Sequence, residues 1–78
     1  MAETPNPFPA AREFGDRVRA RRMDLGWSQE HLAEMAELHW TYVSSVERGL
    51  RNVSLRNILR LANALDVDAG ELIQGLTL

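Results

Sequence analysis

Apolar residues recur along this chain at spacings of three and four residues, which places them on one face of an α-helix. Serine or aspartate precedes several of these runs, where an N-cap belongs, and glycine ends others. No segment alternates with the period of two that a strand needs. The pattern therefore predicts an all-α fold of five short helices around one core, at residues 10–25, 29–36, 40–48, 55–65 and 69–74.

Each predicted helix carries an apolar face that is expected to point inward. Because such short helices are marginal in water, mutual burial of these faces must supply most of the stability. The expected inward residues are Phe14, Val18, Arg22 and Leu25, then Leu32, Met35 and Ala36, then Tyr42, Val43 and Val46, and finally Leu55, Ile58, Leu59, Ala62 and Leu65.

The length of 78 residues and the absence of cysteine exclude a multidomain enzyme, disulfides and thiolate metal sites. Prolines alternate with other residues up to Pro9, so residues 1–9 are predicted to be a flexible arm and residues 10–78 the folded domain. No apolar run matches a signal peptide or a membrane span of about 20 residues. We therefore expect a cytoplasmic protein without a membrane partner.

Charge is distributed unevenly along the chain. The net charge is −2, and all nine basic residues are arginine. An acidic balance by itself argues against a nucleic-acid partner. Between Arg48 and Arg60, however, there are four arginines and no acid. This cluster is either a solvated helix face or a phosphate-binding surface.

Two short predicted helices, at residues 29–36 and 40–48, are joined by three residues, as in a helix-turn-helix. The sequences GWSQEHLA, LHWTYVS, VERGLRN and ANALDV, which start at residues 26, 38, 46 and 62, resemble the lambda-repressor-like (Cro-type, XRE) helix-turn-helix family. Within it, the chain is most similar to restriction-modification controller proteins. The resemblance covers roughly residues 12–74 and implies a compact domain whose second motif helix lies in the major groove of double-stranded DNA.

The resemblance also implies roles for individual side chains. It assigns contacts with DNA bases to Trp40, Thr41, Ser44 and Ser45. It assigns contacts with DNA phosphates to Gln29, Tyr42, Arg48, Arg51 and Asn52.

Trp40 and Glu37 depart from the family pattern. Relatives commonly carry arginine or glutamine where this chain has Trp40, whereas an indole offers one donor and a large apolar face. Trp40 could therefore pack on a thymine methyl, stack on a neighbour or face a protein. Glu37 stands in the turn, where the family often has glycine, and a positive φ there costs on the order of 1 kcal/mol.

Two charged residues, Arg22 and Glu47, are expected at inward positions of their helices. Both also match positions that pair in the family. We therefore predict an ion pair between the first helix and the second helix of the motif, the reading helix that would lie in the major groove. This pair would not contact DNA.

One short reading helix contacts only a few base pairs, which is too few to discriminate an operator from the competing sites of a genome. We therefore predict a homodimer on a (pseudo)palindromic operator. The expected dimer surface consists of the apolar residues near the C-terminus. These are Leu65, Val67, Leu72, Ile73, Leu76 and Leu78.

Two other functions remain open. One is a protein-interaction module, with Trp40 as anchor and the acids Glu30, Glu34 and Glu37 facing a protein. The other is a DNA-binding antitoxin, which keeps the DNA role and adds a toxin partner.

No signal points to catalysis, a metal or a cofactor. His31 and His39 have no third ligand in a metal motif, and Ser44 and Ser45 have no accompanying catalytic framework. We expect no enzyme activity, no metal, no cofactor and no small-molecule effector.

Overall fold

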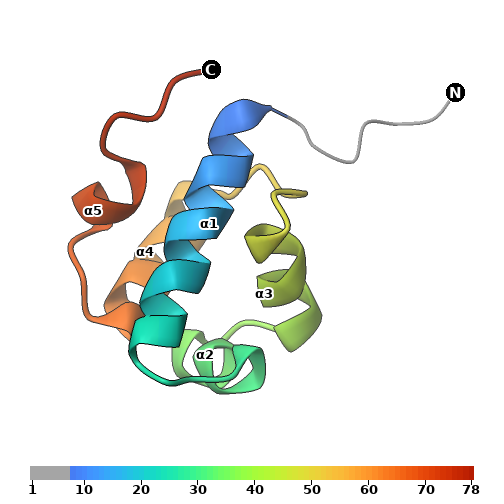
Figure 1. The fold of residues 1–78 in the computed structure, drawn as a ribbon. Helices are drawn as coiled ribbons and strands as arrows, with labels where there is room; N and C mark the ends of the chain where they lie inside the picture. The colour runs from blue at the N-terminus through green and yellow to red at the C-terminus, as the bar shows by residue number, and fades with distance from the viewer. Residues whose placement is uncertain (1–7) are drawn as a thin grey trace, which may run out of the picture.

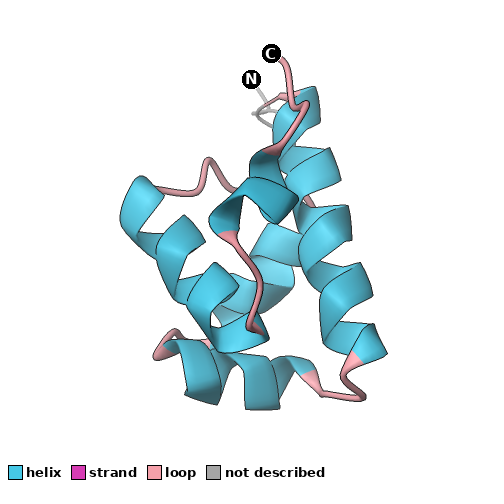
Figure 2. Cartoon of the chain, turned by 90° about the vertical axis from the view of Figure 1, so that its left-hand side faces the viewer, coloured by secondary structure: helices cyan, strands magenta, loops and turns pink. Residues whose placement is uncertain are grey.

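The computed structural model describes residues 8–78 and contains five α-helices and no strand in that range (Figures 1 and 2). This confirms the predicted all-α class. The helices are α1 (Pro9–Asp24), α2 (Gln29–Ala36), α3 (Trp40–Glu47), α4 (Leu55–Leu65) and α5 (Ala69–Ile73). None of the helices in this part of the chain is long and apolar enough to cross a membrane.

The first helix begins earlier than predicted. Phe8 is its N-cap residue and Pro9 occupies its first turn. Proline is tolerated there because its missing N–H would have no helical partner, so extending the non-helical arm through residue 9 was wrong. Residues 1–7 of the predicted arm lie outside the described residues.

Side-chain caps start the later helices where the sequence predicts them. The Ser28 hydroxyl accepts a hydrogen bond from the His31 backbone N–H at 3.0 Å, and Ser54 accepts one from Asn57 at 3.2 Å. The Asp68 carboxylate accepts one from the Gly70 N–H at 2.9 Å. Each cap satisfies an N–H group that has no partner within its helix.

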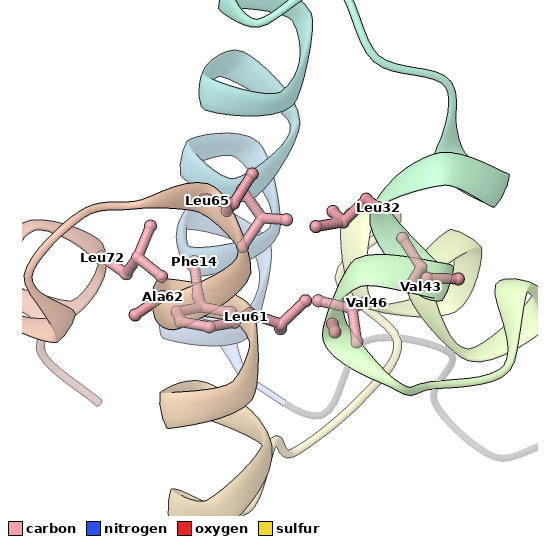
Figure 3. Close-up of a cluster of buried hydrophobic side chains, with 11 residues drawn as sticks. Phe14, Leu32, Val43, Val46, Leu61, Ala62, Leu65 and Leu72 are labelled. Carbon is pink, nitrogen blue, oxygen red and sulfur yellow. The ribbon is translucent and has the colours of Figure 1, made fainter.

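The core gathers side chains from all five helices (Figure 3). Two expectations about it were wrong. Met35 is half exposed, and the inward face of α4 is centred on Leu61, which the predicted stripe omits, while Leu55 is 71% exposed. The largest fully buried side chains are Val18, Leu32, Val43, Val46, Leu61 and Leu65.

Helix α1 fixes the position of α3 by close backbone approach. A Cβ atom added at Gly15 would lie 2.2 Å from the carbonyl oxygen of Val46, which leaves no room for a side chain. Only glycine allows the two helices to meet at this distance. The end of α3 is therefore held directly against the middle of α1.

Candidate nucleic-acid interface

The turn between α2 and α3 sets how the start of α3 is presented. Glu37 adopts the left-handed conformation, with φ 60°, at the position where the family often has glycine. His39 then caps α3, because its Nδ1 accepts a hydrogen bond from the Thr41 N–H at 3.3 Å.

The first residues of α3 project into solvent. The Trp40 side chain remains 47% exposed and Thr41 is also exposed, whereas Ser44 is half-buried. These three residues form the accessible part of the predicted base-contacting set. The exposed part of Trp40 is a large apolar surface at the start of the helix.

Ser45, predicted to contact bases, is buried inside the domain with 6% exposure. Its hydroxyl donates a hydrogen bond to the Tyr42 carbonyl at 2.7 Å and accepts one from the Arg51 Nε at 2.9 Å. The expected contact with a base is therefore corrected to a role inside the protein. Ser45 orients Arg51.

Arg51 is held on a second side by Tyr42. The guanidinium carbon lies 5.4 Å from the centroid of the Tyr42 ring, within the range of a cation–π contact. The Tyr42 hydroxyl accepts a hydrogen bond from the Asn57 side-chain amide at 3.2 Å. Sequence reasoning missed Asn57, because only the fold joins α4 to α3 across this separation.

The predicted pair of Arg22 and Glu47 is present. The Arg22 Nε donates to Glu47 Oε2 at 2.7 Å and Nη2 donates to Oε1 at 2.9 Å, with the Glu47 side chain only 2% exposed. The third guanidinium nitrogen, Nη1, donates to the carbonyl of Trp27 at 2.7 Å. These bonds tie α1, the loop before α2 and the end of α3 together.

The pair stabilises the charged form of Arg22. The hydrogen bond to Glu47 raises the pKa of Arg22 above its usual value, against the opposing effect of burial. The Gln29 side-chain amide also donates to Glu47 Oε1, at 3.1 Å. Gln29, predicted to contact phosphate, therefore uses part of its amide within the protein.

The remaining predicted phosphate residues lie around the end of α3. Arg48 and Asn52 are exposed, and Arg48 Nε makes a long hydrogen bond of 3.4 Å to the carbonyl of Ser44. Arg51 follows in the same loop and is also exposed. The start of α3 thus presents an exposed polar and aromatic surface, and basic side chains follow the C-terminal end of the helix.

Comparison with known proteins places this arrangement in a family. The helix-turn-helix family matches residues 18–72, which is more than half of the chain. The chain belongs to the helix-turn-helix family. The match confirms the resemblance drawn from the sequence, with α2 and α3 as the motif.

Individual relatives refine this assignment. The chain is 46% identical over 66 residues to the control protein C.BamHI of Bacillus amyloliquefaciens, covering 83% of this chain and 82% of that one. The restriction-modification controller protein C.AhdI of Aeromonas hydrophila has a TM-score of 0.81 and 51% identity, over 83% of this chain and 98% of that one. SinR, solved in complex with DNA, has a TM-score of 0.75 and 34% identity, over 78% of this chain and 98% of that one.

The arginine cluster of this helix-turn-helix domain does not form one surface. Arg48 and Arg51 lie by the motif, whereas Arg56 and Arg60 line a groove of about 770 Å³ between α4 and α5. The cluster therefore consists of two pairs of arginines at different places in the fold. Phosphate binding stays a prediction for Arg48 and Arg51.

The predicted dimer surface of the helix-turn-helix domain also divides. Leu65 and Leu72 are buried in its core, so they cannot supply a free surface, and this expectation was wrong for both. Ile73 and Leu78 are exposed, while Val67 and Leu76 are half-buried. Sequence reasoning placed Leu55 and Leu59 in the core, yet both are largely exposed and line the groove between α4 and α5.

Proposed function

We propose that this protein is a transcription regulator that binds double-stranded DNA as a homodimer, with α3 of each subunit in the major groove of one half-site of a (pseudo)palindromic operator. The observation that carries the proposal is the exposed start of α3, on a helix whose end is held by the Arg22–Glu47 pair and followed by exposed Arg48 and Arg51. Similarity to C.BamHI and C.AhdI favours a controller of a restriction-modification system as its specific role.

The decisive test is a gel shift with the DNA upstream of its own gene. Specific complexes that survive an excess of unrelated competitor duplex are expected, at both low and moderate salt. Complexes lost equally to competitor and to operator DNA would contradict sequence-specific regulation.

The groove between α4 and α5 is the surface that we propose for dimerisation. Leu55 and Leu59 supply exposed apolar area, and Arg60 and Asp68 lie in the same groove with opposite charges. In a twofold contact each surface meets its own copy, so arginine and aspartate can pair across the axis. Helices α5 and α3 lie on opposite sides of α1 (Figure 1), which leaves both reading helices free.

A single charge in this groove tests the dimer. Leu59→Asp is expected to convert a dimer into a monomer in sedimentation, because the interface would have to bury a carboxylate. Ile73→Asp is the matched control, since Ile73 is also exposed but does not line the groove. If Ile73→Asp yields the monomer and Leu59→Asp does not, the interface lies on the C-terminal face instead.

A second function, the protein-interaction module, is favoured by one observation, the exposure of Trp40. An aromatic side chain of this size is a common anchor in protein interfaces. A DNA-binding antitoxin would bind both DNA and a toxin partner. The behaviour of Trp40 separates these functions.

Trp40→Ala is expected to weaken operator binding by about 1–3 kcal/mol, the usual cost of one lost base-pair contact. Nonspecific binding should hardly change, because it depends on phosphate contacts. The other tryptophan, Trp27, packs edge-on against His31, with the ring centroids 4.6 Å apart. In a Trp27→Phe variant, the fluorescence of Trp40 should therefore respond to operator DNA. Operator affinity that survives Trp40→Ala, with loss of a protein partner, would favour the interaction module.

A further inference from the structure

A second group of arginines lies outside the helix-turn-helix motif, on α1. Arg12 and Arg19 are seven residues apart, so they share one face of α1, and both are exposed. Together with Arg48 and Gln29 they line a polar cleft of about 430 Å³ between α1 and the motif. The motif and its spacing give no indication of this cleft.

The fold itself keeps these side chains together. A Cβ atom at Gly49 would lie 2.8 Å from the Cα of Arg12, so the end of α3 and the first turns of α1 are in direct contact. Glu47 also lines the cleft, but its carboxylate is already held by Arg22 and Gln29. The acid that remains is Asp16, which lies between the two arginines of α1.

The charge balance of the cleft favours an anion. The ion pairs within residues 8–78 are Arg17–Glu13 and Arg22–Glu47, so neither neutralises an arginine of the cleft. Arginine presents several N–H donors in a plane and suits phosphate oxygens. The cleft is continuous with Gln29 at the start of α2 and Arg48 at the end of α3, both on the motif that we propose faces DNA.

We propose that this cleft binds a backbone phosphate of the DNA, with Arg12 and Arg19 as contacts beyond the helix-turn-helix motif and Asp16 as an opposing charge that limits the affinity. The inference rests on the proposed function and extends it. Helix α1 thereby adds a sequence-independent contact with the duplex beside α3, the reading helix.

The test measures how binding depends on salt, by fluorescence anisotropy with operator and random duplexes. Each phosphate contact contributes about 0.9 to the slope of log affinity against log salt. The double variant Arg12→Gln/Arg19→Gln is expected to lower the slope by about one for each subunit, equally on both duplexes. Asp16→Asn is expected to raise affinity for both duplexes, which general damage to the fold would not do.

Arg17→Gln is the control for the loss of an arginine from α1, because it removes one positive charge from another face of this helix, where Arg17 contacts Glu13 and the Gln74 carbonyl. Its slope should equal that of the unaltered protein. If the double variant behaves like this control, the cleft does not bind phosphate although the regulator does bind DNA. If the unaltered protein binds neither duplex, the proposed function fails and the inference fails with it.

Discussion

Raising the salt concentration from about 50 to about 200 mM is expected to weaken DNA binding by about 10³–10⁵-fold, if the dimer engages about 6–10 phosphates. The reason is that each arginine bound to a phosphate releases a condensed counterion, and added salt opposes that release. The exposed arginines beside α3, Arg48 and Arg51, carry this effect although the chain as a whole has a net charge of −2. Titrations of labelled duplex at several salt concentrations measure it.

Arg48→Gln provides the internal check on this prediction. It should reduce the salt slope by about one per subunit and weaken binding to all sequences alike. A flat salt dependence of the unaltered protein would argue against DNA as its partner.

Removing either member of the buried pair, by Arg22→Ala or Glu47→Ala, is expected to lower the free energy of unfolding by about 3–5 kcal/mol. Each change strands a charge, since the Glu47 side chain is 2% exposed and Arg22 also donates to the Trp27 carbonyl. The double variant should cost much less than the sum of the two, because no charge is left unpaired. Denaturant melts of the three variants give these values.

The exposed pair of Arg17 and Glu13 is the natural comparison. Its oxygen–nitrogen distance is 2.8 Å, close to that of the buried pair, but its side chains are 27% and 59% exposed, against 12% and 2% in the buried pair. Glu13→Ala should therefore change stability by about 1 kcal/mol or less. Strictly additive losses for Arg22→Ala and Glu47→Ala would show that the buried pair does not act as a unit.

The helices and their starts could be predicted from the sequence because their signals are local. Ser28, Ser54 and Asp68 cap helices where their side chains reach a backbone N–H two or three residues ahead. The buried pair was also predictable, since Arg22 and Glu47 stand at inward positions of their helices and match positions that pair in the family that the chain resembles. The partner of a cap lies nearby in the chain, and a charge on the inward face of a helix needs a partner.

The candidate interface was predicted only in part, because helix α3 packs on more than one side. Val43 and Val46 are buried as expected, but burial also extends to Ser45, which then orients Arg51. The resemblance to the family had placed Ser45 among the base-contacting positions. Its burial was decided by the tertiary structure, in which its hydroxyl forms hydrogen bonds with the Tyr42 carbonyl and with Arg51.

The apolar stripe of α4 shows which features the sequence determined and which only the tertiary structure decided. By itself, the sequence determined that this segment is a helix with one apolar side, since leucines recur at helical spacing after a serine cap. It did not determine that Leu61 is fully buried while Leu55 and Leu59 stay exposed. That was decided by the tertiary structure, because an apolar stripe is wider than the strip that neighbouring helices can cover, and only their packing selects which edge remains exposed to solvent or to a partner.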